Sequence, residues 1–473
     1  MNSLNLEKIN IKQISGFRFK EFGKNYLLTN EVGDFAFLNN ENFIGLIENN
    51  LNRKSNSFLE LKRKKFIKNN LNNEELIKEY RNKNKFLWQG PALHIIVLTL
   101  RCNHKCVYCQ SSAYSVSSHG VDMERGVAKK TVDTIFDSPS QEITIEFQGG
   151  EPLVNWETLK FIVRYALTKN KIKKKNLSFT LVSNFSLLNN EKLNFLIKYK
   201  VLICTSLDGP KYIHDKNRRF LSNRSSYDLV VSWINKINKI NNGKSISGAL
   251  CTITKHSLPH PKNIVDEYIK HHFNEIHLRP LSFLGFARLV QDEIGYSPAD
   301  FIDFYSKALE YIIELNLNNK STIRERTAKI FLSKILKKIE TNFYDLRSPC
   351  GAGIGQMLYN FDGRVFTCDE ARMINDDSLV IGNIRDNKYK DLISHENVAV
   401  MVTASCLEGL TCEYCVYKPY CGVCPVLNLV EQGNIFTVCN FRCQVNKGIL
   451  DYLFTKIREK KVLKLFNHWL DLN

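Results

Sequence analysis

The feature that most constrains the fold is a regular alternation of apolar and amphipathic segments between residues 93 and 280. Helical patterns, such as those at 123–136 and 156–169, alternate with short strand-like runs. The runs lie at residues 93–100, 143–148, 179–184, 201–207, 246–254 and 275–280. Near-continuous apolar strands separated by helices are typical of a parallel sheet covered by helices. The sequence therefore predicts an α/β fold in which six such units form a partial (β/α)6 barrel.

Polar motifs follow the first four of these strands. A cysteine-rich loop follows the first strand and GGEP (149–152) follows the second. Ser183 and Asn184 end the third strand, and DGP (208–210) follows the fourth. In a parallel sheet the chemistry gathers where the strands end, so we expect these four motifs to form one site.

The cysteine-rich loop, LTLRCNHKCVYCQ (98–110), carries Cys102, Cys106 and Cys109 as CxxxCxxC. Four thiolates close an iron–sulfur cube, so three would leave one iron free to bind a small molecule. The alternative is a zinc site, for which His104 would have to serve as the fourth ligand at an awkwardly short spacing.

This loop resembles that of the radical S-adenosylmethionine (SAM) enzymes, in which an aromatic residue, here Tyr108, directly precedes the last cysteine. The resemblance implies a [4Fe-4S] cluster with SAM bound at the open iron. It also implies a 5′-deoxyadenosyl radical that removes a hydrogen atom from the substrate, while the protein orients the cofactor and excludes competing reactions.

GGEPL (149–153) resembles the second signature of that family. The resemblance implies that Gly149, Gly150 and Glu151 hold the amino group of SAM, which suits close backbone approach and a carboxylate acceptor. An ordinary Gly-Pro turn is the alternative. Ser183 and Asn184 match the strand end that contacts the ribose, although a glycine usually follows there and this chain has phenylalanine.

SLDGP (206–210), with Ser206 and Asp208, and IHDKNR (213–218) resemble a further segment of the peptide-modifying members. In that segment an arginine pairs with the SAM carboxylate, which makes Arg218 the candidate here. A surface pair between Asp215 and Arg218 is the alternative reading.

The C-terminal region is similar to the seven-cysteine SPASM domain, which holds two auxiliary clusters in radical SAM enzymes that modify peptides and proteins. Its spacing departs from the family at Cys421 and Cys424, which are separated by two residues where the family usually has three. By position, one cluster would be held by Cys412, Cys415 and Cys421 with Cys443 or Cys439. The other would be held by Cys350, Cys368 and Cys424, with or without Cys406.

A zinc ribbon is the alternative for this region, because two CxxC pairs fit one well. It leaves Cys350, Cys368, Cys439 and Cys443 without a role. Asp369, next to Cys368, is the candidate general base: in similar maturases a carboxylate at this place takes the substrate proton as the radical is oxidised. A surface or helix-capping aspartate is the alternative.

The pattern along the chain predicts five parts. Residues 1–90 form an α+β module that could recognise a peptide by adding a strand to its sheet edge, or could simply cap the barrel. The partial barrel covers 91–290. A helical connector covers 291–345 and contains two long amphipathic patterns, at roughly 298–318 and 322–340. An auxiliary-cluster domain follows at 346–445, and a closing helix, placed at 446–466, ends the chain in residues 446–473.

The likeness also holds at a finer level, from about residue 20 to residue 445. LHIIVLTLRCNHKCVYCQ, EFQGGEPL, TSLDGP, LRPLSFLGFA and GAGIGQMLYNFDGRVFTCDEARM together resemble the radical SAM maturase of His-Xaa-Ser repeat peptide systems. This resemblance implies a ribosomally made precursor peptide as substrate, a paired radical SAM protein and a low-potential electron donor of the flavodoxin or ferredoxin type. We expect oxidative modification of the peptide, best described as a cross-link.

Composition decides among the remaining function classes. The formal net charge of +18 would suit a nucleic-acid partner, but Lys, Asn and Ile are frequent throughout, so we interpret the charge as general bias. No run suits a membrane helix or a signal peptide, so we expect a cytoplasmic protein without disulfides. Two rival functions remain: formylglycine formation as in an anaerobic sulfatase maturase, and a binding partner that supports a second radical SAM enzyme.

Overall fold

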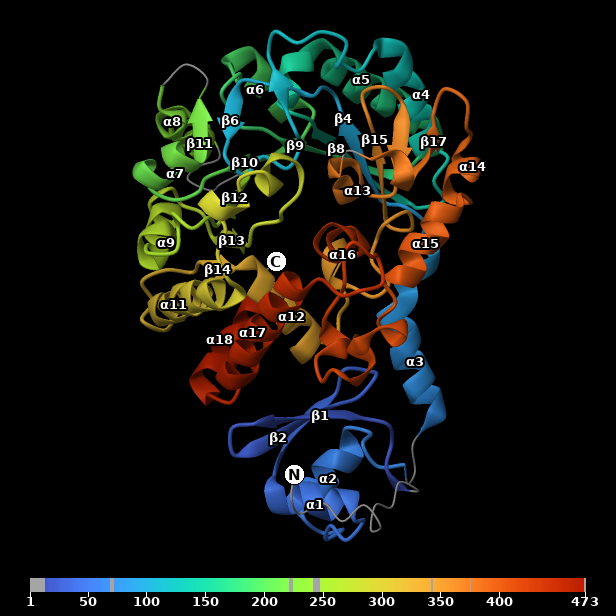
Figure 1. Cartoon of the computed structure of the whole chain (residues 1–473), viewed down its shortest axis with the longest axis vertical. Helices are drawn as coiled ribbons and strands as arrows, with labels where there is room; N and C mark the ends of the chain where they lie inside the picture. The colour runs from blue at the N-terminus through green and yellow to red at the C-terminus, as the bar shows by residue number, and fades with distance from the viewer. Residues whose placement is uncertain are drawn as a thin grey trace.

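The computed structural model describes residues 13–68, 72–220, 224–240, 247–341, 343–374 and 376–471. At its centre is a sheet in the order β14-β13-β12-β10-β9-β8-β4-β15-β16-β17 (Figure 1). Every pair from β14 to β15 is parallel. The predicted α/β fold with a parallel sheet of six β/α units is therefore confirmed, and no described strand closes the sheet into a complete barrel.

The six predicted strands all form and follow one another across the sheet. They are β4 (Leu93–Val97), β8 (Glu142–Gln148), β9 (Asn176–Val182), β10 (Val201–Ser206), β12 (Ser247–Thr252) and β13 (Glu275–Arg279). On β8, fully buried Ile143, Ile145 and Phe147 alternate with half-buried residues that include Glu146. One face of the sheet therefore packs on helices, whereas the other carries polar side chains toward the interior.

Helices on the outer face connect these strands. They are α4 (Arg125–Ile135), α5 (Trp156–Lys173), α6 (Asn190–Lys198), α7 (Lys211–Asn217), α8 (Ser226–Ile240) and α9 (Pro261–Lys270). The connector that follows contains α10 (Gln291–Ile294) and α11 (Pro298–Leu317). α11 begins where the sequence predicts, because Ser297 and Asp300 form a reciprocal capping box around Pro298.

The C-terminal region contributes to the central sheet, which the sequence does not predict. β15 (Gln356–Tyr359) pairs with β4 in parallel, and β16 (Arg364–Phe366) and β17 (Val380–Asn383) continue the sheet in antiparallel order. In Figure 1 these orange strands stand beside β4. The cysteine-rich region is thus anchored on the first barrel strand.

Two predicted helices differ from the structure. The helix expected at 322–340 is α12 (Arg326–Leu336), because β14 (Arg324–Glu325) first pairs with β13, and the Glu325 carboxylate then caps the helix by accepting from the Ala328 amide. The closing helix expected at 446–466 is two helices, α17 (Asn440–Lys456) and α18 (Lys460–Asp471). Because α17 starts at Asn440, it carries Cys443, and the boundary predicted at residue 445 falls inside this helix.

The remaining C-terminal helices are short. They are α13 (Asp369–Met373), α14 (Tyr389–Ile393), α15 (Glu396–Ala404) and α16 (Pro425–Gln432). Cys368 caps α13 and Cys424 caps α16, and the two helices contact each other. Two of the predicted ligands are therefore brought near one another by local backbone structure.

The N-terminal module is a three-stranded antiparallel sheet with two helices beside it. Its elements are β1 (Arg18–Phe22), β2 (Asn25–Thr29), β3 (Phe35–Asn39), α1 (Asn40–Ile47) and α2 (Asn56–Arg63). α3 (Asn73–Asn84), which has no buried residue, connects the module with the barrel along one side of the molecule (Figure 1).

The module docks on the C-terminal region. The buried Arg18 forms ion pairs with Glu31 and Glu413, and Thr29 donates a hydrogen bond to the carbonyl of Val416. The ring of Phe35 packs edge-on against Phe454 of α17. The module therefore lies directly against the segment that carries Cys412 and Cys415. None of the helices in the described ranges has the length and apolar character needed to cross a membrane.

Candidate active site

Short strands hold the cysteine loop in place. β5 (Arg101–Cys102) pairs with β7 (Tyr114–Ser115), and β6 (His104–Cys106) pairs with β11 (Arg218–Phe220), so that Cys106 lies opposite Arg218. The Cys109 amide donates to the Cys106 carbonyl at 3.2 Å. The three cysteines are thus fixed at the carboxyl end of β4.

The electrostatics of this loop favour a cationic occupant. Burial, opposed by the charge of Arg218 and reinforced by the nearby Cys109 thiol, raises the pKa of the Cys106 thiol to about 12. Burial and the neighbouring Cys106 also raise the pKa of Cys102. Three thiolates gathered in a buried site repel one another, so they need a positively charged metal group to stabilise them.

His104, the ligand that the zinc alternative needs, is buried in β6, and neither of its ring nitrogens has a hydrogen-bond partner among the described residues. Its ring packs on Phe220 with centroids 4.7 Å apart, and burial lowers its pKa to about 4. Within the described residues, no three His, Cys, Asp or Glu side chains converge closely enough to hold a single metal ion.

The GGEP motif forms backbone hydrogen bonds with the segment that enters the cysteine loop. The amides of Gly150 and Glu151 donate to the carbonyls of Thr99 and Arg101, both at 2.8 Å. A Cβ on Gly149 would lie 2.4 Å from the Thr99 carbonyl oxygen. The glycines are therefore required for β8 to approach the segment that enters the cysteine loop, a contact that the motif alone does not reveal.

Glu151 connects the ends of two strands. It is fully buried, and its carboxylate accepts hydrogen bonds from the Ser183 hydroxyl and from the amides of Asn184 and Leu153, at 2.8 to 3.0 Å. The Asn184 side chain in turn lies 3.8 Å from the Cys102 sulfur. The structure thus brings together the cysteine loop, GGEP and the end of β9, as the sequence predicts.

Asp208 is the centre of a second buried group. Its carboxylate accepts from the Tyr108 hydroxyl at 2.6 Å, from Arg218 Nε at 3.2 Å and from the Thr252 amide at 3.2 Å. Asp215, the alternative partner of Arg218, instead accepts from the Tyr227 amide at 2.8 Å. Among the described residues the two Nη atoms of Arg218 form no hydrogen bond, and its guanidinium lies over the Tyr108 ring, 5.2 Å from the ring centroid. Ser206 is buried at the end of β10.

Charged residues also lie at the interior of the sheet, and one of them, Glu146, was not predicted from the sequence. Asp369, the predicted base, is half-buried, and the net effect of burial, opposed by Arg372 and Arg279, is a raised pKa. Glu146 of β8 also has a pKa raised by burial, and its charge interacts with that of Asp369. A charged residue within the apolar strand ITIEFQ was the available signal for Glu146.

Three thiols near Asp369 form the inner cysteine group: Cys350, Cys368 and Cys424. Burial raises the pKa of the Cys368 thiol, and Glu370, Cys424 and Cys350 raise it further. All three cysteines belong to one packed cluster with Ala371 and Val426. The Cys406 thiol donates to the Val402 carbonyl at 3.3 Å, and its membership of this group stays a prediction.

A buried cation without a hydrogen-bond partner lies beside this inner group. Arg347 is 1% exposed, its guanidinium stacks between Phe86 and Tyr344, and its Nε and Nη2 atoms have no partner among the described residues. Its charge interacts with Cys350. An unpaired buried guanidinium is costly, and an anionic cluster held by the three thiolates would compensate it.

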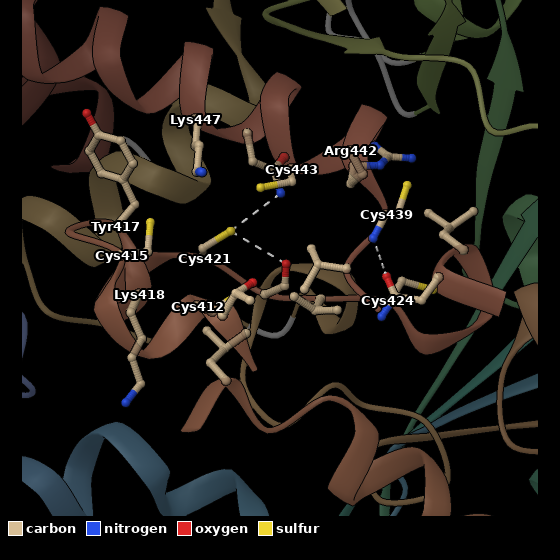
Figure 2. A pocket seen from close by; sticks show the side chains of 18 of the residues that line it. Cys412, Cys415, Tyr417, Lys418, Cys421, Cys424, Cys439, Arg442, Cys443 and Lys447 are labelled. Atoms are coloured by element: carbon tan, nitrogen blue, oxygen red, sulfur yellow. Dashed lines mark hydrogen bonds between the residues drawn. The ribbon is translucent and has the colours of Figure 1, made fainter. Parts of the chain in front are cut away.

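A second set of thiols forms the outer cysteine group: Cys412, Cys415, Cys421 and Cys443. They line a cavity of about 620 Å³, which includes some open solvent (Figure 2). Burial, together with the charges of the other three thiols, raises the pKa of Cys412 to about 12. The Asn446 amide donates to the Cys421 sulfur at 3.5 Å.

Cys439 does not join the outer group. Its thiol donates to the Glu431 carboxylate, and in Figure 2 its sulfur points away from Cys421 and Cys443. The geometry therefore favours Cys443 over Cys439 as the fourth member. This choice could not be made from spacing, because both cysteines are near the start of α17.

Comparison with known proteins agrees with this geometry. The family described as a 4Fe-4S single cluster domain matches residues 88–231. The cysteine-type anaerobic sulfatase-maturating enzyme of Clostridium perfringens is 26% identical over 78% of this chain and 98% of its own length. The radical SAM cyclopropyl synthase TigE of Paramaledivibacter caminithermalis is 24% identical over 93% of this chain and 88% of its own. The chain is therefore similar, over most of its length, to radical SAM maturases.

Solved structures show the same fold. Native anSMEcpe with bound AdoMet and Kp18Cys peptide superposes with a TM-score of 0.67, at 22% identity, over 80% of this chain and all of that one. Streptococcus suis SuiB bound to precursor peptide SuiA gives a TM-score of 0.56 at 14% identity, over 91% and 99% of the two chains. The narrower likeness to His-Xaa-Ser systems stays a prediction.

Gly150 provides a stability test of this radical SAM fold. A Cβ at this position would lie 2.4 Å from the Arg101 carbonyl oxygen and 2.6 Å from that of Leu100, and these backbone atoms cannot move aside. We expect Gly150→Ala to lower the free energy of unfolding by about 1–3 kcal/mol or more. A Cβ at Gly126 in α4 would meet no atom within 4 Å, so Gly126→Ala should leave the free energy of unfolding unchanged or raise it slightly. Anaerobic urea unfolding measures both, and equal stability would contradict the close approach.

Proposed function

We propose that this chain is a radical SAM enzyme that oxidatively modifies side chains of a ribosomally made precursor peptide, by forming a cross-link. The observation that supports this most is the arrangement of three thiols, Glu151 and Arg218 at one end of the sheet, with Asp369 and two further thiol groups nearby. Relatives point the same way, since TigE is a cyclopropyl synthase and SuiB is bound to a precursor peptide.

The residues fit the implied cofactors. The CxxxCxxC thiols would hold a [4Fe-4S] cluster, and Arg218, Asn184 and the GGEP backbone would hold SAM. When bound, these groups supply the 5′-deoxyadenosyl radical that takes a hydrogen atom, and clusters at the C-terminal cysteines supply an acceptor for the leftover electron. The inner group has three thiols and the outer group has four. The protein would therefore supply three ligands to the inner cluster and four to the outer cluster.

The chain's own residues would position the substrate and move its proton. Asp369 accepts the proton that the peptide releases when the new bond forms, because its raised pKa makes it a stronger base than an exposed aspartate. The charges of Arg372 and Arg279 limit that rise in the pKa. The buried interior excludes water, which would otherwise compete for reactive intermediates.

Three partner assignments belong to the same proposal. The edge strands of the N-terminal sheet would bind the leader part of the precursor peptide. A flavodoxin- or ferredoxin-type protein would supply low-potential electrons, and a second radical SAM protein would act on the same peptide. We also propose that the chain acts in the cytoplasm, where thiols stay reduced.

The second candidate function is formylglycine formation on a sulfatase, which the Clostridium perfringens relative favours. A third reading, a binding partner without productive SAM cleavage, has no support from the assembled three-thiol site. Anaerobic incubation of the reconstituted protein with SAM, dithionite and the precursor peptide tests the proposal against both rivals. Peptide-dependent 5′-deoxyadenosine formation would support the proposal, whereas its absence would overturn it and leave the sulfatase and binding functions.

The outer cysteine group gives a paired prediction. If Cys443 is the fourth ligand, we expect Cys443→Ala to change the electron paramagnetic resonance signal of that cluster and to remove up to about four irons per chain. Cys439→Ala should change neither quantity, because its thiol is engaged with Glu431. Iron analysis and spectroscopy of the two reconstituted variants measure this, and the reverse pattern would assign Cys439 instead.

A further inference from the structure

A second cavity opens at the mouth of the interior, outside the cofactor site. It lies between the segment 111–114, which follows the cysteine loop, the short helix Gly285–Arg288 and the hairpin of β15 and β16 with α13. Its volume is about 920 Å³, including open solvent. It is therefore large enough for a short stretch of polypeptide.

Two buried polar side chains line this cavity without completing their hydrogen bonds. Arg372 is 8% exposed and Asn360 is 3% exposed. Among the described residues, Arg372 Nε and Nη2 have no hydrogen-bond acceptor, and Asn360 Oδ1 has no donor. Buried polar groups in folded proteins are usually paired. These atoms therefore indicate a ligand that offers a hydrogen-bond acceptor to Arg372 and a hydrogen-bond donor to Asn360.

The required ligand chemistry follows from these atoms. Arg372 offers only donors, whereas Asn360 Oδ1 only accepts. A carboxylate would satisfy Arg372 but would repel the amide oxygen. A peptide unit satisfies both, since its carbonyl accepts from the guanidinium and its N–H donates to Asn360.

The walls of the cavity suit an apolar side chain. Tyr114 and Phe286 line it and remain 52% and 44% exposed. Arg364, the other arginine of the cavity, is already paired with Asp362 and Asp377. Arg372 instead has Asp369 as its ion-pair partner, and its Nε and Nη2 atoms form no hydrogen bond among the described residues.

We propose that this cavity is a subsite for an extended segment of the substrate peptide, in which Arg372 and Asn360 bind one peptide unit while Tyr114 and Phe286 contact an apolar side chain. This inference rests on the proposed peptide substrate. Arg372 Nη2 is also 3.6 Å from Asp369 Oδ1, an ion-pair distance. The bound peptide unit would therefore lie next to the proposed base, and a neighbouring residue would enter the interior.

The test uses a small probe, so that it does not depend on catalysis. N-acetyl-leucine N-methylamide carries two peptide units and one apolar side chain. Its binding to the full-length reconstituted protein can be titrated by ligand-observed nuclear magnetic resonance. We expect Arg372→Gln to raise the dissociation constant about tenfold, as loss of hydrogen bonds to a charged donor predicts. Arg364→Gln, the paired arginine of the same cavity, should leave it within about twofold.

A further variant keeps the test informative if Arg372→Gln fails to fold. Phe286→Ala changes an exposed wall, so it should weaken the leucine probe but not the corresponding glycine probe. Equal weakening by Arg372→Gln and Arg364→Gln, competition by acetate, or no binding to the unmodified protein would each overturn the subsite. If the subsite fails while peptide-dependent 5′-deoxyadenosine still forms, only this inference is lost.

Discussion

Replacing Cys102, Cys106 and Cys109 together by Ala should abolish 5′-deoxyadenosine formation and leave the precursor peptide unmodified. The three thiols are fixed by β5, β6 and β11, and burial with mutual repulsion makes them dependent on a bound metal group. We expect the reconstituted variant to lose about four irons per chain and to keep the iron of the C-terminal groups. Iron analysis and chromatography of the SAM products measure both effects.

Cys204→Ala is the matched control for this triple variant. Cys204 lies on β10 and is half-buried in the same domain, but it is not part of the cysteine loop. It should retain the full iron content and full SAM cleavage. If the triple variant still cleaves SAM, the assignment of the cysteine loop as the cluster site is wrong.

The second large effect is expected for Asp369→Asn. An amide of the same shape cannot accept the substrate proton, so we expect peptide modification to slow by about 100-fold to 10,000-fold, the usual contribution of a general base. Cleavage of SAM should continue, because Asp369 does not belong to the cysteine loop or the GGEP motif. Parallel quantification of 5′-deoxyadenosine and of modified peptide separates the two steps.

Asp386→Asn is the control for Asp369→Asn, since Asp386 is an exposed aspartate of the same C-terminal region. It should leave both yields unchanged. Equal loss of 5′-deoxyadenosine and of product in Asp369→Asn would show instead that this residue supports cofactor binding or folding, as the neighbouring charges of Arg372 and Arg279 would permit.

The parallel strands were predictable because each is a local apolar run between helices, and β4 to β13 form in that order. The pairing of β15 with β4 was not predictable in this way. QMLY is only four residues long, and its place depends on a contact with a strand more than 250 residues earlier. Local pattern identifies such a segment only as irregular structure.

The candidate site was likewise predictable only where it depends on residues close in sequence. Spacing identified the CxxxCxxC thiols and GGEP, because those residues act through short-range geometry. Spacing could not choose between Cys443 and Cys439, which depends on the turn into α17 and on Glu431. It also missed Glu146 and Arg347, whose roles arise from burial beside residues that are distant in sequence.

The most direct test of the central claim is the mass of the precursor peptide after anaerobic co-expression with this protein. The proposal predicts loss of hydrogens in pairs, only with Cys102, Cys106 and Cys109 intact, and fragmentation would then locate the new bond. An unchanged peptide mass, in cells where 5′-deoxyadenosine accumulates, would contradict oxidative cross-linking by this chain.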